Sequence, residues 1–343
     1  MEKTDLLILS PAELIDWFTS IGEKPFRAKQ VDSWIHCKLV TDFDAMTNIS
    51  KPLRESLKER AQISFFQSHT AIEGDPEGTL KFLFTLEDGL RIESVLIKHG
   101  DRKTVCVSSQ VGCAVGCAFC ATGKMKDRRN LTVSEIVNQF LYIKRNYEPE
   151  PTNIVFMGMG EPFFNYDNVI KAAQIFNEQS GLKVGARKIT ISTAGVVKEI
   201  YRYKEEEHKF KLAISLTGRN DEIRDKLIPL NKKYKLESIL KAAEIFSDRP
   251  HNRITFEWVL IKDWSDTNED LAFLKKLSKR MPCKINLIPL NPVDSEFEPP
   301  SQEHLDDFFH KLQDANCRVT IRNSSGSESQ AACGQLNSDY YQK

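Results

Sequence analysis

Long hydrophobic runs are missing from this sequence, since its apolar stretches, such as Leu6 to Leu9, cover only a few residues. A helix that crosses a bilayer needs roughly 18 consecutive apolar residues, so we expect no membrane-spanning segment. The acidic start from Met1 to Asp5 is followed by too short an apolar run for a secretory signal peptide. The sequence therefore predicts a cytoplasmic protein.

A net charge is also missing, because 48 Lys and Arg residues balance 48 Asp and Glu residues. The overall balance gives no electrostatic reason to expect a polyanionic partner. The seven histidines are scattered with no pair at i and i+4, which disfavours a histidine metal site. Hydrophobic residues at 41% and charged residues at 28% are close to globular averages, which excludes collagen-like and wholly disordered chains.

The charge is nevertheless unevenly distributed. Residues 101 to 130 include six basic and two acidic side chains. Such a run is most often a solvated surface, but it also suits contact with phosphate groups. We hypothesise phosphate contacts for four of these basic residues, which are Lys124, Lys126, Arg128 and Arg129.

With 343 residues, the chain is long enough for two domains, or for one barrel-sized unit with an appendage. Capped helical patterns predict a helical accessory domain over residues 1–65, and two alternating stretches separated by Glu87-Asp88-Gly89 predict a β hairpin over 66–98. Six strand–helix repeats over 99–328 predict an α/β fold with a parallel sheet, either doubly wound or curled into a partial barrel. Both arrangements place chemistry at the carboxyl ends of the strands. Residues 329–343 form a C-terminal segment.

Four of the eight cysteines fall within 15 residues, and three of these, Cys113, Cys117 and Cys120, form a C-x3-C-x2-C run. Thiolates bind iron–sulfur clusters and zinc. A structural zinc site would need a fourth ligand, and residues 121–150 contain no further Cys or His. Three thiolates would leave one iron of a cluster open to a substrate or cofactor. Zinc with a distant fourth ligand, or buried cysteines at this spacing by chance, are the alternatives.

The cysteine spacing, with Phe119 before the last cysteine, resembles the radical S-adenosylmethionine (SAM) superfamily, and Met157 to Pro162 is similar to its Gly-Glu-Pro motif. Four separated segments sharpen this resemblance to RlmN-type adenine-C2 methyltransferases: 106–113, 156–162, 191–196 and 331–336. The N-terminal stretch with Phe26 to Gln30 and Trp34 also resembles that family's accessory domain. The resemblance implies a partial (β/α)6 barrel of the TIM-like type, one 4Fe-4S cluster and SAM as cofactor.

The same resemblance implies a role for each matching residue. Cys333 would carry a methyl group from one SAM as S-methylcysteine, and a second SAM, bound at the cluster held by Cys113, Cys117 and Cys120, would yield a 5′-deoxyadenosyl radical that activates this group. Cys106 would then form a transient disulfide with Cys333 and release the methylated base, and Glu93 would act as acid–base residue. The implied SAM contacts are Gly160, Glu161, Ser192, Ser215, Leu216, Thr217 and Asn291.

Two departures from the family pattern stand out. Thr217 occupies a position where the family usually has His, so a ring contact to SAM is lost although a hydroxyl is still available. Ahead of the two alanines that precede Cys333, the family usually has Asp-Ile. This sequence has Gly326 to Gln330 there instead, which puts the family's loop dynamics and RNA contacts in doubt.

The partners implied by the resemblance are 23S rRNA, near the peptidyl-transferase centre, and tRNA, at the adenosine next to the anticodon. A flavodoxin or ferredoxin would be the electron donor, and we expect a monomer. The alternatives are a Cfr-type enzyme that methylates adenine C8, a cluster-bearing RNA-binding or scaffold protein without turnover, and a radical SAM enzyme that acts on a small molecule.

Overall fold

The computed structural model describes residues 3–66, 68–73, 78–248, 253–293, 295–322 and 330–338. Of the residues Ser327 to Gln330 that depart from the family pattern, only Gln330 lies within the described residues. Within these ranges no helix has the length and apolar character that crossing a membrane requires.

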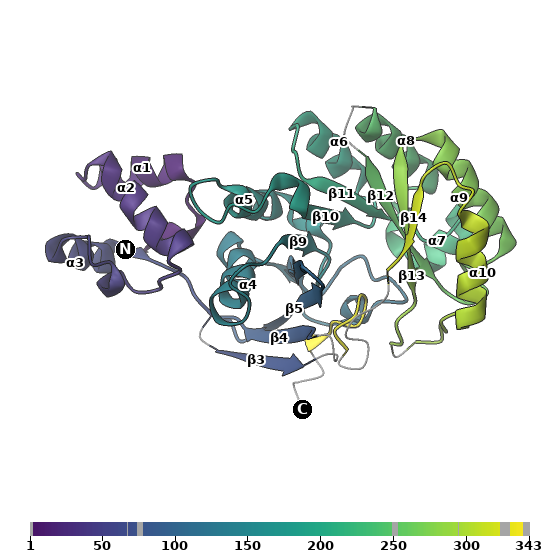
Figure 1. The fold of residues 1–343 in the computed structure, drawn as a ribbon, viewed down its shortest axis with the longest axis horizontal. Coiled ribbons are helices and arrows are strands. Elements are labelled where there is room, and N and C mark those ends of the chain that lie inside the picture. The colour runs from purple at the N-terminus through teal and green to yellow at the C-terminus, as the bar shows by residue number, and fades with distance from the viewer. Residues whose placement is uncertain are drawn as a thin grey trace.

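The N-terminal helices form a module beside the main body of the protein (Figure 1). A short turn joins helices α1 (Pro11–Ser20) and α2 (Pro25–Asp32). Helix α2 continues into a π-helical turn at Ser33–Cys37, and a longer connection leads to α3 (Lys51–Arg60). Strands β1 (Thr4–Asp5) and β2 (Ala61–Gln62) pair in parallel and bring the two ends of the module together. The predicted cap of α1 is present, because Ser10 and Glu13 each accept a hydrogen bond from the other's backbone N–H.

A single ten-stranded sheet forms the centre of the protein, in the order β14-β13-β12-β11-β10-β9-β6-β5-β4-β3. Seven strands are parallel: β6 (Arg102–Cys106), β9 (Asn153–Phe156), β10 (Ile189–Thr193), β11 (Lys211–Ser215), β12 (Ile254–Leu260), β13 (Cys283–Pro289) and β14 (Arg318–Ile321). Three antiparallel strands extend it: β3 (Ser68–Glu73), β4 (Leu80–Thr85) and β5 (Arg91–His99). A separate ladder pairs β7 (Gln110–Val111) with β8 (Arg129–Asn130).

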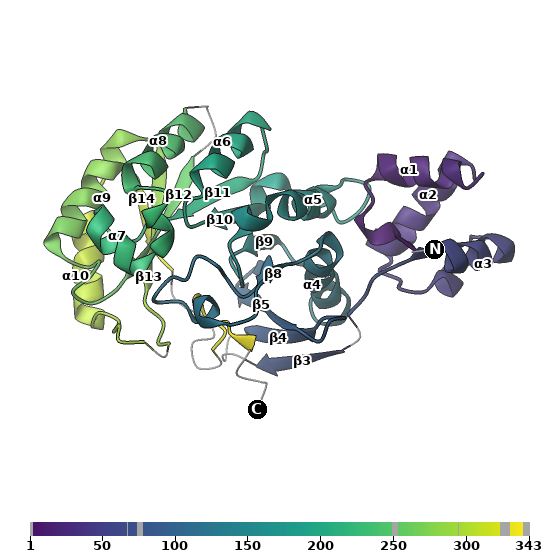
Figure 2. The same cartoon turned by 180° about the vertical axis from the view of Figure 1, so that it is seen from behind.

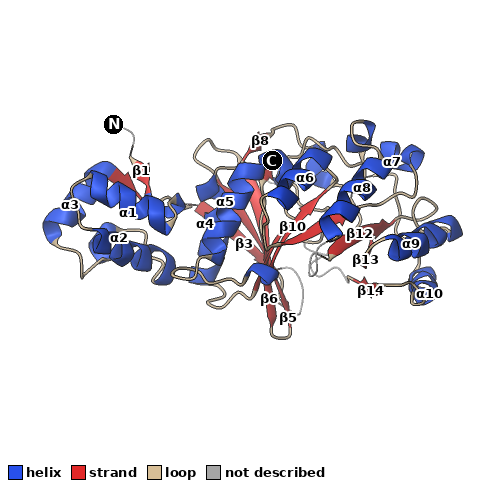
Figure 3. Ribbon diagram, turned by 90° about the horizontal axis from the view of Figure 1, so that it is seen from above, coloured by secondary structure: helices blue, strands red, loops and turns tan. Residues whose placement is uncertain are grey.

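Helices connect the parallel strands and cover the outer face of the curved sheet, which Figures 2 and 3 show from behind and from above. They are α4 (Val133–Asn146), α5 (Tyr166–Asn177), α6 (Val197–Glu205), α7 (Asp221–Leu227), α8 (Leu236–Ser247), α9 (Asn268–Arg280) and α10 (Gln302–Leu312). Every parallel strand before β14 is followed by such a crossover. The predicted α/β fold with six strand–helix units is confirmed.

Three elements differ from the expectation. The predicted hairpin is β4–β5, but β3 adds a third strand, and β5 pairs directly with β6, so the hairpin is continuous with the barrel sheet. Helices α6 and α7 were not predicted. Both helices are short, with nine and seven residues, and each buries only two side chains, so neither offers the long periodic stretch that predicts a helix most clearly.

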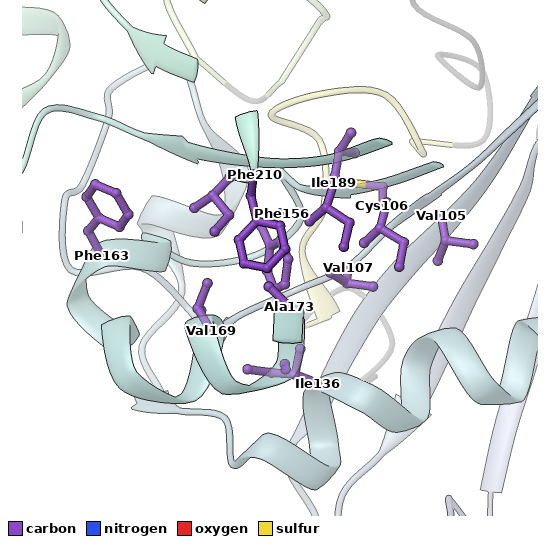
Figure 4. Packing of buried hydrophobic residues seen from close by; sticks show 14 of the residues in the cluster. Val105, Cys106, Val107, Ile136, Phe156, Phe163, Val169, Ala173, Ile189 and Phe210 are labelled. Carbon is purple, nitrogen blue, oxygen red and sulfur yellow. The ribbon is translucent and has the colours of Figure 1, made fainter. Parts of the chain in front are cut away.

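The core lies between the sheet and its helices. Figure 4 shows Phe156 of β9 among side chains from β6, β10, α4 and α5, such as Ala173, and beside Val107, which follows β6. Phe156 is 1% exposed. The same packing fixes β6 and β9, whose carboxyl ends lead into the cysteine-rich loop and the loop that follows Phe156.

Truncation of this ring tests the core. Phe156→Ala should lower the free energy of unfolding by about 3–5 kcal/mol, because it removes buried contacts and leaves a cavity. Phe26→Ala is the matched control, since Phe26 is 48% exposed and its loss should change stability by less than about 0.5 kcal/mol. Urea denaturation followed by circular dichroism measures both, and equal midpoints for the two variants would contradict this packing.

Candidate active site

The strand register places three functional side chains on one face of the sheet. Lys81 of β4 lies opposite Val95 of β5, and Val95 lies opposite Cys106 of β6. Directly opposed residues point to the same face, and Glu93 shares it because it is two residues from Val95. Cys106 is the last residue of β6, so this face reaches the carboxyl edge of the parallel strands.

Cys106 and Cys333 line a common cavity of about 50 Å³, together with Val95, Met157 and Arg322 among others. Burial raises the pKa of the Cys106 thiol to about 12 and that of Cys333 to about 11, while the Arg322 guanidinium opposes both rises. Cys333 is nevertheless exposed, because the cavity opens beside it, whereas Cys106 is buried. The two cysteines are thus brought together from distant parts of the chain.

Arg322 is paired with a buried carboxylate that the sequence analysis did not identify. Its Nη1 lies 3.6 Å from Oε1 of Glu257, and Ser192 Oγ donates to the other Glu257 oxygen at 3.3 Å. Burial raises the pKa of Glu257, and the Arg322 charge opposes this rise. The available signal was a lone glutamate inside the apolar strand from Ile254 to Leu260.

Glu93 is fully buried, with Lys81 as its ion-pair partner. Lys81 Nζ lies 3.0 Å from Glu93 Oε1, and the two side chains are 1% and 0% exposed. Burial raises the pKa of Glu93, while the positive charge of Lys81 and the backbone of Asn337 oppose this rise. Lys81 Nζ also donates to the carbonyl of Gln330 at 3.3 Å. The predicted acid–base residue therefore lies beneath the C-terminal segment.

Hydrogen bonds hold residues 330–338 against the carboxyl edge of the sheet. Asn291 Nδ2 donates to the Cys333 carbonyl at 2.9 Å, and the Ala121 N–H donates to the Gly334 carbonyl at 2.7 Å. Thr122 Oγ1 donates to the Leu336 carbonyl at 2.6 Å. Figures 1 and 2 show this yellow segment beside the loop that carries the cysteine run.

The cysteine run occupies the loop between β7 and a 3-10 helix at Ala121–Lys124. Cys117 interacts electrostatically with both Cys113 and Cys120, so the three thiols are neighbours. Burial raises the pKa of Cys113 to about 12 and also raises that of Cys117 well above its ordinary value. Among the described residues, no group of three or more His, Cys, Asp or Glu side chains is arranged so that it could hold a single metal ion. A 4Fe-4S cluster takes each thiolate at a different iron, so neighbouring thiols around a common space fit this cofactor.

The loop after β9 is packed tightly against the segment that leads to the cysteines. A Cβ on Gly160, at φ +101°, would lie 2.5 Å from Gln110 Cβ, so glycine is required there. The Glu161 N–H donates to Gln110 Oε1 at 2.8 Å. Glu161 itself accepts from the N–H groups of Phe163 and Ala194, and burial raises its pKa to about 7. This loop therefore joins the carboxyl ends of β6, β9 and β10.

The other predicted SAM residues also follow or end parallel strands. Arg224, which the sequence analysis did not identify, is fully buried and donates to the carbonyls of Ala194, Ser215, Leu216 and Thr217. The positive charge of Arg224 also opposes the rise in the pKa of the Cys117 thiol. Thr217 is fully buried, and its Oγ1 accepts a hydrogen bond from the Val259 N–H at 2.9 Å. The hydroxyl that stands where the family usually has His is therefore bonded within the protein.

The basic residues after the cysteine run differ in their surroundings. Lys124, Lys126 and Arg128 are exposed, as phosphate contact requires. Arg129 instead binds carboxylates, with Nε 2.6 Å from Asp88 and Nη2 2.8 Å from Glu135. Its charge is therefore neutralised within the protein, and three of the four hypothesised residues remain available.

Comparisons with known proteins agree with this architecture. Residues 4–63 match the family described as the ribosomal RNA large subunit methyltransferase N-terminal domain, and residues 107–275 match the radical SAM superfamily. The chain is 44% identical over 332 residues to a probable dual-specificity RNA methyltransferase RlmN of Thermotoga sp. (strain RQ2), covering 97% of each protein. It is also 44% identical over 336 residues to the dual-specificity RNA methyltransferase RlmN of Pelobacter propionicus, covering 98% of this chain and 96% of that protein.

A solved structure extends the likeness to the whole fold. The radical SAM methyltransferase from Sphaerobacter thermophilus is 40% identical, with a TM-score of 0.91 over 97% of this chain and 99% of that one. The radical SAM superfamily implies a 4Fe-4S cluster and SAM as cofactors. Both the accessory module and the barrel are thus matched in sequence and in structure, and the chain belongs to the RlmN family of radical SAM proteins.

Proposed function

We propose that the protein is a radical SAM RNA methyltransferase that methylates C2 of adenosine, using S-methylcysteine at Cys333 and two SAM molecules per turnover. The observation that supports this proposal most strongly is the cavity shared by Cys106 and Cys333 at the carboxyl edge of the sheet. A protein that only bound a cluster would need no second pair of thiols there. The names of the relatives support RNA as the substrate.

Each side chain then has a separate task. Cys333 carries the methyl group, and Glu93 takes up the proton that leaves C2 of the adenine. The thiolate of Cys106 attacks the sulfur of Cys333, so that the S–S bond forms as the bond from that sulfur to the base-linked methylene carbon breaks. The methylene carbon leaves with the electron pair and takes up a proton, which gives the methyl group of the released base. The Arg322 charge favours the thiolate of both cysteines against the effect of burial.

Cys113, Cys117 and Cys120 would hold the cluster, and Gly160, Glu161, Ser192, Ser215 and Asn291 would lie around SAM. When bound, these cofactors supply the one-electron chemistry that no side chain provides. Asn291 has a second task, since its amide already binds the backbone of Cys333.

We assign 23S rRNA near the peptidyl-transferase centre, and the adenosine 3′ of the anticodon in some tRNAs, as the substrates. Flavodoxin or ferredoxin would deliver the electron, and the enzyme would act as a monomer in the cytoplasm. Lys124, Lys126 and Arg128 would contact RNA phosphates beside the cysteine loop.

The direct test is product identification. The cluster-reconstituted protein is incubated anaerobically with reductant, methyl-deuterated SAM and unmodified rRNA and tRNA fragments, and the digested nucleosides are analysed by mass spectrometry. Labelled 2-methyladenosine is the expected product, and the fragment that contains it names the RNA. Labelled 8-methyladenosine alone would assign the protein to the Cfr type, and the absence of both products with an intact cluster would contradict the proposal.

Substitution of the two cysteines should separate their tasks. Cys333→Ala should abolish product, since it removes the methyl carrier, whereas Cys106→Ala should accumulate a covalent protein–RNA species that survives denaturation. Denaturing gels and peptide mass spectrometry measure this species at residue 333. Cys37→Ala is the matched control, because Cys37 is a free, exposed thiol in the helical module. Release of product by Cys106→Ala at the normal rate would refute the role of Cys106.

The ion pair between Lys81 and Glu93 should set the pH at which the reaction rate falls. Glu93 must be ionised to accept a proton, so activity should fall as the pH drops through its pKa. Lys81 opposes the rise in the pKa of Glu93, and Lys81→Met should therefore shift the acidic limb of the kcat profile upward by about one to three pH units. Activity of this variant should recover at high pH.

Lys81→Arg keeps the positive charge and should leave the limb near its original position. Lys98→Met is the matched control on β5, because Lys98 pairs with Glu148 at 3.6 Å rather than with Glu93. A uniform loss of activity across the pH range in Lys81→Met, without a shift of the limb, would show that Lys81 acts only on structure.

A further inference from the structure

A cavity of about 990 Å³ lies at the amino-terminal ends of the parallel strands, away from Cys106 and Cys333. Its lining includes Lys211 at the start of β11, Thr255 near the start of β12 and Lys284 near the start of β13. The active-site residues lie at the carboxyl ends of the same sheet. In strand–helix folds the amino-terminal end usually contributes to stability rather than to chemistry, so this cavity has no role in the site described above.

The cavity lining is strongly basic. Two carboxylate residues, Glu207 and Asp248, also line it. The lining also includes His208, which pairs with Glu206 at 2.7 Å. In the described part of the chain, no Asp or Glu forms an ion pair with any of the seven Lys and Arg residues of the lining. These seven residues are Arg187, Lys188, Lys204, Lys209, Lys211, Arg253 and Lys284.

The cations are also placed close to one another by the strand register. Lys284 of β13 lies directly opposite Arg318, the first residue of β14. Burial lowers the pKa of Lys211, and repulsion by Lys284, Arg102 and Arg187 lowers it further. Like charges on neighbouring strands destabilise a sheet. The protein therefore tolerates repulsion here that a bound polyanion would relieve.

Helix dipoles explain only part of this arrangement. Helices that return between parallel strands end at this rim, and cations in their last turn are stabilised. Lys204 lies in the last turn of α6 and fits that explanation. Lys211 and Lys284 are strand residues, however, and Arg253 directly precedes a strand. The strand cations thus need another reason.

We propose that this cavity binds a ligand that carries several phosphate groups. Its volume lies within the range of about 300–1,000 Å³ that small-molecule sites occupy. Arginine binds phosphate oxygens in pairs, and lysine adds point charges. A single anion would neutralise only a fraction of the basic lining. The phosphates come either from an RNA backbone or from a free polyphosphate such as a nucleotide, and the proposal does not depend on the reaction at the other end of the sheet.

Calorimetric titration of the full chain with tripolyphosphate tests the proposal. Lys211→Gln/Lys284→Gln should weaken tripolyphosphate binding at least tenfold, and its unfolding midpoint should equal or exceed that of the wild type because repulsion is removed. Lys198→Gln/Lys276→Gln is the matched control, since it removes the same charge from exposed helix positions, and it should bind as the wild type does. Arg187→Gln, on an exposed turn, repeats the test if the double variant fails to fold.

Competition distinguishes the two sources of phosphate. The ligand is an RNA backbone if two results are obtained. Unmodified RNA fragments must displace tripolyphosphate, and the slope of log K for RNA binding against log salt concentration must become less steep by about two in the double variant. If RNA does not compete, the ligand is a free polyphosphate. Equal tripolyphosphate affinity in the wild type and the double variant, no measurable binding to the wild type, or equally tight binding of citrate would overturn the proposal.

Discussion

The attachment of residues 330–338 to the carboxyl edge of the sheet is the constraint on which the active site depends. Asn291 binds the backbone of Cys333, and Ala121 binds that of Gly334. These bonds connect the C-terminal segment at once to the loop after β13 and to the loop that carries the cysteine run. The segment is thus held at both sides, in the position where Cys333 shares a cavity with Cys106. The parallel register supplies the other half, since it places Cys106 and Glu93 on the sheet face that the segment covers.

Buried charges surround this site, and each has a partner of opposite charge or several carbonyls. Lys81 pairs with Glu93, Arg322 lies beside Glu257, and Arg224 binds four carbonyl groups of two loops. Removing one member of such a pair leaves an unpaired buried charge, which is costly. The same charges oppose the effect of burial on nearby groups, because Arg322 favours both thiolates and Lys81 favours the Glu93 carboxylate. The same contacts therefore hold these side chains in place and influence the pKa values of the two thiols and of Glu93.

Local patterns in the sequence were enough for the parallel strands, the longer helices, the cysteine run and the family. The parallel strands are apolar and regularly spaced, and the cap of α1 is encoded within four residues. Glu257 and Arg322 were not identified, because they lie far apart in the chain and only the folded sheet brings them together. Lys81 and Arg224 have partners nearer in the chain, but the local pattern reveals neither the strand register that opposes Lys81 to Glu93 nor the loop carbonyls that Arg224 reaches. The hydrogen-bond partner of Thr217, the Val259 N–H, was also not predicted, because it lies 42 residues away in the chain. The polar edge strand β3 lacks the alternating apolar pattern that reveals β4 and β5.

The fold alone, without substrate or cofactor, brings Cys333 next to Cys106. Oxidation of the cluster-free protein with diamide, followed by peptide mapping under non-reducing conditions, tests this claim without any turnover. A disulfide between Cys106 and Cys333 should be the main product, and its yield should fall in Asn291→Ala, which releases the backbone of Cys333. A Cys333 that pairs mainly with Cys120, or a Cys106 that stays reduced while Cys333 is oxidised, would contradict it.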